Sequence, residues 1–114
     1  MNKTVYIVQE PLRRNLQTGE LERMMDLTPA AAYGKPVVLI NNGKLPLMAA
    51  PLIQNLRQGL KDFNDDDFLL PVGSPAAMAF AGAVAAEMNR GQLNVLVWDK
   101  ETRRYIEVSG NVRG

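Results

Sequence analysis

Residues 68–88 read FLLPVGSPAAMAFAGAVAAEM, and this stretch decides the fold because it joins an apolar strand to an apolar helix through a tight turn. The run 68–72 predicts a strand, and Pro71 indicates that its pairing stops near there. Ser74 is predicted to cap the helix with its side chain, and Pro75 suits the first helical position. No polar side chain occurs in residues 76–86, so the helix is predicted to be buried all round.

The rest of the chain alternates between strand and helix signals. The run 36–40 is apolar on both faces, as expected of a buried parallel strand. The polar stretch 11–26 is predicted to be a long loop, apart from a turn that could form around residues 21–25, and the tail 109–114 is predicted to be frayed. Further strands are predicted at 4–8, 93–98 and 104–108, and further helices at 28–34 and 51–63.

This order predicts a single α/β domain over residues 1–114. Strands that alternate with helices indicate a mostly parallel sheet with helices on both faces. The short connection between the last two strands adds an antiparallel hairpin at one edge. The expected architecture is therefore a small three-layer sandwich of the Rossmann-like or flavodoxin-like kind.

The composition excludes several kinds of site. The chain has no Cys and no His, so it has no Cys/His zinc site, no cysteine nucleophile and no histidine base. We expect no catalytic residue, no cofactor and no metal, although catalysis by other side chains stays open. The net charge of +1 gives no strong field toward nucleic acid or an anionic membrane. No apolar run is long enough to span a bilayer and no signal peptide is evident, so a cytoplasmic location is expected.

Several stretches together carry a family resemblance. They are YIVQEP at 6–11, FNDDDFLLPVGSPAA at 63–77, and WDK at 98–100 with RRYIEV at 103–108. The chain resembles a family of small proteins of unknown function encoded in bacteriophage genomes. The resemblance is weakest over residues 12–34, and members commonly have Asp in place of Ser74. It implies phage origin, expression in the bacterial cytoplasm and an accessory role, and it transfers no catalytic residue.

Polar side chains follow three of the predicted strands at their carboxyl ends, where doubly wound sheets bind ligands. The backbone N–H groups at the start of the helix at Pro75 favour an anion there, although proline removes one donor. Neither a dinucleotide fingerprint nor a phosphate-binding loop motif occurs, and helix capping alone also explains Ser74. The residues of this candidate ligand site are Gln9, Asn41, Asn42, Lys44, Gly73 and Ser74.

Two charged clusters allow weaker hypotheses. The basic residues Lys100, Arg103 and Arg104 stand near two aromatic residues, a pattern typical of single-stranded nucleic-acid binding. Interleaved acidic residues dilute the charge, and edge strands also carry charge to prevent aggregation. The aspartates of residues 62–67 lack the calcium-loop pattern and are interpreted as a solvated loop.

The sequence favours a non-catalytic module that binds a host or phage protein. The first alternative is a Rossmann-like binder of a nucleotide or another small phosphorylated ligand, and the second is nucleic-acid binding through the terminal hairpin. A homo-oligomer stays open, because a second chain could cover one face of the alanine-rich helix. Arg13 and Arg14 lie either in a binding loop or in a merely solvated one.

Overall fold

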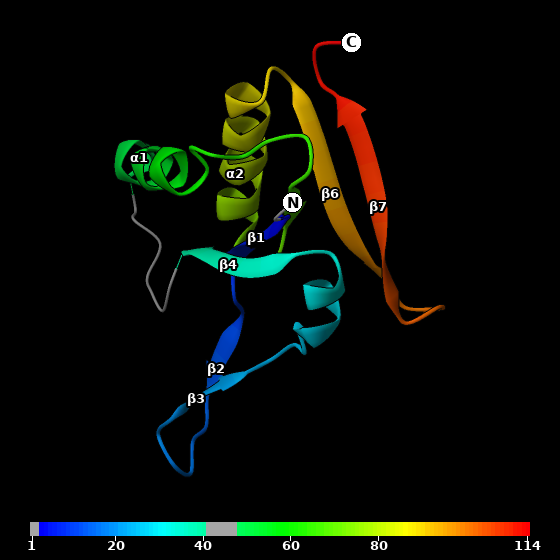
Figure 1. The fold of residues 1–114 in the computed structure, drawn as a ribbon. Coiled ribbons are helices and arrows are strands. Elements are labelled where there is room, and N and C mark those ends of the chain that lie inside the picture. The colour runs from blue at the N-terminus through cyan, green and yellow to red at the C-terminus, as the bar shows by residue number, and fades with distance from the viewer. Residues whose placement is uncertain (1–2, 41–47) are drawn as a thin grey trace.

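The computed structural model describes residues 3–40 and 48–114 (Figure 1). Five strands form one sheet in the spatial order β4-β1-β5-β6-β7. The pairs β4·β1, β1·β5 and β5·β6 are parallel, and β6·β7 is antiparallel. The strands of this sheet are β1 (Thr4–Gln9), β4 (Lys35–Ile40), β5 (Phe68–Leu70), β6 (Gln92–Asp99) and β7 (Arg104–Asn111).

The predicted α/β class, the mostly parallel sheet and the C-terminal antiparallel hairpin are confirmed. The apolar strand at 36–40 lies at the edge of the sheet and is only partly buried, contrary to its prediction as a buried strand. Its side chains still pack into the hydrophobic clusters on both faces of the sheet, which explains the apolar run. Pro36 is compatible with this place because an edge strand has no ladder to complete on its outer side.

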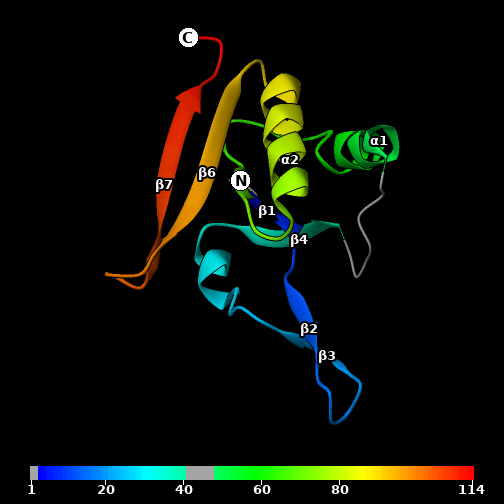
Figure 2. The same cartoon turned by 180° about the vertical axis from the view of Figure 1, so that it is seen from behind.

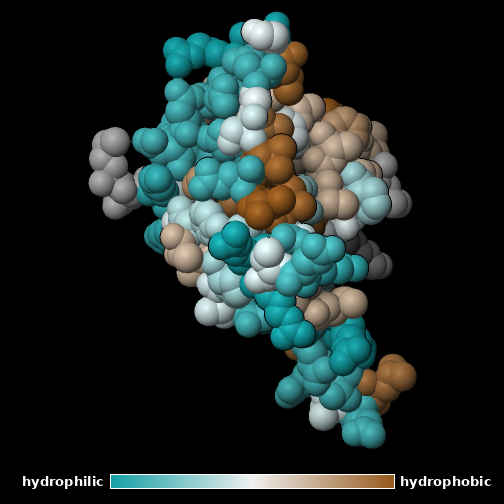
Figure 3. Space-filling view, turned by 90° about the vertical axis from the view of Figure 1, so that its right-hand side faces the viewer, coloured by the Kyte–Doolittle hydropathy of each residue, from teal (hydrophilic) through white to brown (hydrophobic). Residues whose placement is uncertain are grey.

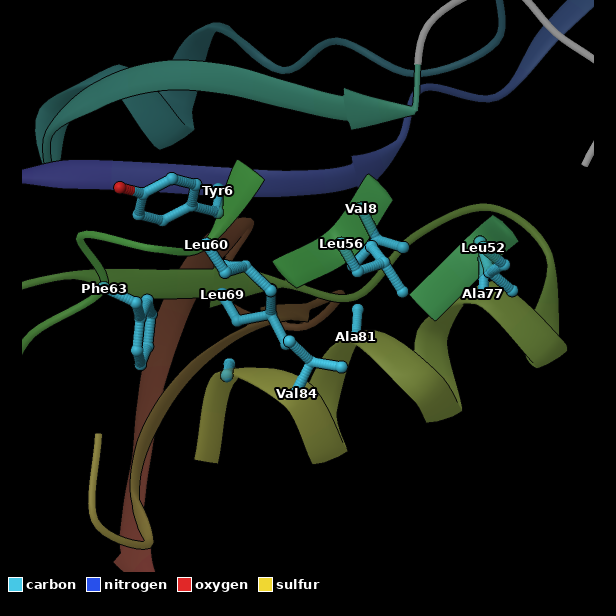
Figure 4. Packing of buried hydrophobic residues seen from close by; sticks show 11 residues of the cluster. Tyr6, Val8, Leu52, Leu56, Leu60, Phe63, Leu69, Ala77, Ala81 and Val84 are labelled. Carbon is cyan, nitrogen blue, oxygen red and sulfur yellow. The ribbon is translucent and has the colours of Figure 1, made fainter. Parts of the chain in front are cut away.

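Both α-helices lie on one face of the sheet. Helices α1 (Ala49–Gly59) and α2 (Pro75–Met88) pack on each other and on side chains of β1 and β5, as Figure 4 shows. One stripe of α1 supplies Leu52 and Leu56 to this core, and Leu60 follows at its C-cap. The small residues Ala77 and Ala81 let α2 approach the sheet closely.

The opposite face is covered by a 3₁₀ helix, η1 (Thr28–Ala32), and the segment around it. Leu27 and Ala30 pack there against the β1 side chains Val5 and Ile7. The ring of Tyr33 meets Phe68 edge-on at 5.7 Å between centroids. The three-layer sandwich predicted an α-helix on this face, and the structure has only the short 3₁₀ helix η1 there.

Helix α2 is not buried all round. Ala77, Ala81 and Ala85 face the core, but Ala79 and Ala83 are exposed. The hairpin β6–β7 runs beside the helix without covering it (Figure 2). Alanine tolerates this place because it is a good helix former and its methyl group exposes little apolar surface.

The stretch 11–26 forms a hairpin instead of a loop. Strands β2 (Leu12–Arg14) and β3 (Leu21–Arg23) pair antiparallel as a separate two-stranded sheet. Figures 1 and 2 both show this hairpin projecting from the body of the protein, and we call residues 10–24 the arm. The predicted frayed tail is likewise ordered, because β7 continues to Asn111 in register with Gln92. Within the described ranges, no helix has the length and apolar character needed to cross a membrane.

Candidate functional site

Three of the predicted ligand-site residues meet where β1 and β5 end. The Gln9 backbone N–H donates to the Val72 carbonyl at 3.1 Å. The Gln9 side-chain oxygen Oε1 accepts from the Ser74 N–H at 2.9 Å. Gly73 lies between these contacts with a φ of 105°, which L side chains rarely adopt. The structure therefore brings Gln9, Gly73 and Ser74 together, while Asn41, Asn42 and Lys44 lie outside the described residues.

Ser74 occupies the predicted cap position, but the prediction that its side chain caps the helix is wrong. Ser74 stands at the N-cap position of α2, but its side chain makes no capping hydrogen bond. The N–H of Ser74 is instead satisfied by Gln9, 65 residues away in the chain. A side chain of β1 thus satisfies a backbone donor at the entry to α2, where the sequence predicted a local cap.

We expect Gln9→Ala to destabilise the protein by about 1 kcal/mol, since it removes the acceptor of a partly buried N–H. Ser74→Ala should change the free energy of unfolding by less than about 0.5 kcal/mol, well below the usual cost of losing a cap. Urea unfolding of both variants measures the two values. A larger loss for Ser74→Ala than for Gln9→Ala would contradict this assignment.

The basic residues of the terminal hairpin do not share one face with its aromatic residues. Trp98 and Tyr105 are directly opposite in the register and meet edge-on at 5.0 Å. Arg104 is the next residue along β7, so its side chain points to the other face. Lys100 and Arg103 are exposed in the turn. Stacking and phosphate contacts would therefore be divided between the two faces of the hairpin.

An acidic side chain organises this turn. The Asp99 carboxylate accepts from the Thr102 hydroxyl at 2.6 Å and from the Glu101 N–H at 3.1 Å. The Thr102 hydrogen bond is the main reason that the pKa of Asp99 is lowered, and Arg104 contributes to the same direction. The turn is thus a locally bonded structure in which a carboxylate stands among the basic side chains.

The aspartates at the amino edge of the sheet include one that is almost fully buried. Asp67 is 2% exposed, and its carboxylate accepts from the N–H groups of Thr4 at 3.0 Å and Asn64 at 3.1 Å. Burial raises its pKa, and the two backbone donors oppose this shift. Asp67 therefore joins β1 to the loop before β5, and the solvated-loop interpretation is wrong for this residue.

The arm is the surface feature that the sequence reasoning missed. Its base is held by an ion pair between Arg23 Nε and Glu10 Oε1 at 2.8 Å and by the Met24 N–H on the Pro11 carbonyl at 3.1 Å. Asn15 organises the tip, because its Oδ1 accepts from two N–H groups of the turn. The turn residues Asn15 and Gly19 between two short runs were the available signal.

Exposed apolar side chains gather on two surfaces. On the arm, Leu16 is 97% exposed, Leu21 51% and Met24 58%. A second group lies on the α2 side of the terminal hairpin, next to the exposed alanines of α2 (Figure 3). We call this group the aliphatic strip, and it consists of Val97, Ile106, Val108 and Val112.

The comparisons with known proteins point to one family. Residues 3–112 match the family described as Phage Pam3 gp32-like protein. No curated protein and no solved structure matches the chain significantly. The match covers nearly the whole chain and confirms the resemblance to small phage proteins of unknown function. The chain therefore belongs to the phage Pam3 gp32-like family.

Proposed function

We propose that this phage protein is a non-catalytic interaction module, and that its arm binds a phage or host protein in the cytoplasm of the infected bacterium. The observation that carries the proposal is the exposure of Leu16, a large aliphatic side chain at 97% on the tip of an ordered projection. Exposed apolar side chains gathered on one element are typical of protein-binding surfaces.

The arm is ordered although it has little support from the rest of the fold. Its strands pair mainly with each other, and an isolated two-stranded hairpin is marginally stable in water. Several contacts offset this weakness, including the Arg23–Glu10 ion pair and the hydrogen bond from Asn15 Nδ2 to Glu22 Oε1 at 2.6 Å. These contacts hold the arm in its projecting position, so that Leu16 and Leu21 lie away from the body of the protein.

The chemistry of the arm defines its partner. Leu21 lies on β3 directly opposite Arg14, so apolar and charged side chains alternate near the tip. A protein with an apolar cleft that accepts one or two leucines, and with polar groups at the rim of that cleft, fits this pattern. Such a partner would bury Leu16 as the central contact of the interface.

Leu16→Asp is expected to weaken partner binding by about 2 kcal/mol, or about 30-fold, because a charge would enter an apolar cleft. The measurement is affinity capture from phage-infected bacterial lysate with quantitative mass spectrometry, followed by titration of the captured partner. Val97→Asp is the matched control, because Val97 is another exposed aliphatic residue, 41% exposed and on a different surface. Equal capture by wild type and Leu16→Asp would remove the arm from the proposal.

A second candidate is a small phosphorylated ligand at the carboxyl ends of the strands. Counted in chain order within the large sheet, the strands lie 2-1-3-4-5, which supports a flavodoxin-like arrangement with its crevice beside β1 and β5. Gln9 and Ser74 lie there. A rise in melting temperature with nucleotides, lost in Gln9→Ala, is the expected result of this candidate. An unchanged melting temperature across nucleotides would remove it.

A further inference from the structure

Strand β7 forms one edge of the large sheet. Among residues 3–40 and 48–114, no strand pairs with its outer side. An unpaired strand edge is a template for another strand unless charges, proline or a bulge protect it. The other edge strand, β4, begins with Lys35 and Pro36, whereas β7 is eight residues long, has no proline, and carries charge at Arg104 and Glu107 but none from Val108 to Asn111. The edge of β7 is therefore the less protected of the two.

The hydrogen bonds of the hairpin fix which backbone groups face outward. The Val112 N–H donates to the Gly91 carbonyl at 2.8 Å, so these two residues form a hydrogen-bonded pair. Antiparallel ladders alternate between bonded and non-bonded pairs, and so every second residue of β7 turns its N–H and C=O away from β6. The outward residues are Tyr105, Glu107, Ser109 and Asn111.

Both ends of this outer edge are already engaged. The Tyr33 hydroxyl donates to the Tyr105 carbonyl at 2.7 Å. At the other end, the Gly114 N–H donates to the Asn111 carbonyl at 3.2 Å. The carbonyl groups of Tyr105 and Asn111 therefore both point away from β6. The central part of the edge, at Glu107 and Ser109, is where a second strand can add hydrogen bonds.

We propose that β7 pairs antiparallel with β7 of a second copy, with the two-fold axis through Val108. In this register Glu107 faces Ser109 of the second copy, and Ser109 faces Glu107. The outward N–H and C=O groups of both residues are then paired in both copies. The interface is isologous, as expected of a two-fold dimer.

Two registers shifted toward the hairpin turn are disfavoured. An axis through Glu107 would place two carboxylates directly opposite each other, which is destabilising. An axis through Ile106 would pair only residues 104–108, because β7 begins at Arg104, directly after the hairpin turn. The axis through Val108 aligns residues 104–112 and keeps the two glutamates out of direct opposition.

The side chains on the α2 side of the hairpin are complementary in this register. Ile106, 42% exposed, faces Gly110 of the second copy, so a large side chain meets a residue without one. Val108, 53% exposed, faces its own copy. Within a single chain, a Cβ atom added at Gly110 would have no other atom within 4 Å. The space above Gly110 is therefore open to a side chain of a second copy. Pairing thus gives two members of the aliphatic strip a partner.

The predicted interface is small. A single pair of edge strands buries less than the roughly 1,600 Å² of a standard interface. The dimer should therefore dissociate on dilution, with a monomer–dimer equilibrium visible by sedimentation at micromolar concentrations.

Cysteine cross-linking tests the register directly, because the chain has no cysteine of its own. Val108 and its copy form a non-hydrogen-bonded pair, with Cα atoms about 4.5 Å apart, a distance that a disulfide can span. We expect Val108→Cys to form a disulfide-linked dimer under mild oxidation. Ile106→Cys, which is also exposed on the same face but faces Gly110, should stay largely monomeric. Equal cross-linking of both variants, or none of Val108→Cys, would overturn the proposal.

A charge exchange provides the second test. Val108→Lys and Val108→Glu should each be monomeric, since like charges then face each other on the axis, and their equimolar mixture should dimerise. Because Val108 is exposed, both variants should keep the circular dichroism spectrum of the wild type. Dimerisation of Val108→Lys alone, or no dimer in the mixture, would contradict the register. Leu16→Asp should dimerise as wild type does, so the arm and the edge are tested separately.

Discussion

Replacing Gly73 by alanine is expected to lower the free energy of unfolding by about 2–4 kcal/mol. Two causes add at this position. The φ of 105° lies where an L residue is strained. A Cβ would also lie 2.5 Å from Gln9 Cβ and 2.8 Å from the Gln9 carbonyl oxygen, so β1 or the entry to α2 must shift. Urea unfolding gives the loss, and melting temperature should fall with it.

Two other glycines separate these causes. Gly19, in the arm, has a φ of 76° but nothing within 4 Å of an added Cβ, so Gly19→Ala should cost about 1 kcal/mol from the backbone alone. Gly82, within α2, also has open space and no positive φ, so Gly82→Ala should stabilise by about 0.5–1 kcal/mol. If Gly73→Ala cost no more than Gly19→Ala, the close approach of Gln9 would be wrong.

The elements that were predicted correctly are those whose pattern depends on local burial. The apolar stripe of α1 packs into the core on one face of the sheet, and the apolar runs of β1 and β5 supply side chains to the cores on both faces. The spacing of apolar residues within each element is enough to predict this burial. The arm was missed because its three-residue strands have partly exposed side chains and therefore no apolar alternation. Its contacts are turn hydrogen bonds and the Arg23–Glu10 ion pair, which leave no periodic pattern in the sequence.

The proximity of three of the proposed ligand-site residues could also be predicted, whereas their contacts could not. Topology alone places the ends of β1 and β5 side by side, so the proximity of Gln9 to Ser74 follows from the parallel sheet. What the sequence could not provide is the contact between them, because local rules assign the capping role to Ser74 itself. Burial of α2 was overestimated, since composition does not say how far a sheet extends beneath a helix.

Asp67 gives the other large expected effect. Asp67→Ala should lower the free energy of unfolding by about 2–4 kcal/mol, because it empties a buried side-chain position and leaves the partly buried N–H groups of Thr4 and Asn64 without their acceptor. Asp67→Asn keeps one oxygen, but turns an NH₂ group toward the other donor, and should cost about half as much. Asp66→Ala is the matched control, since Asp66 is an exposed neighbour in the same loop and should change stability by less than about 0.5 kcal/mol.

The pH dependence of the stability lost in Asp67→Asn shows how much of that loss comes from the titration of the Asp67 carboxyl group. Burial raises the pKa of folded Asp67 above the ordinary value of 3.8, so the folded state holds this proton at pH values where the unfolded chain has lost it. The stability that Asp67 contributes is therefore fully present below the ordinary pKa and falls as pH rises through the raised one. The difference in unfolding free energy between wild type and Asp67→Asn, measured from about pH 3 upward, should shrink over that window, because asparagine does not titrate. A difference that grows with pH would mean that the N–H donors of Thr4 and Asn64 outweigh burial and stabilise the ionised carboxylate.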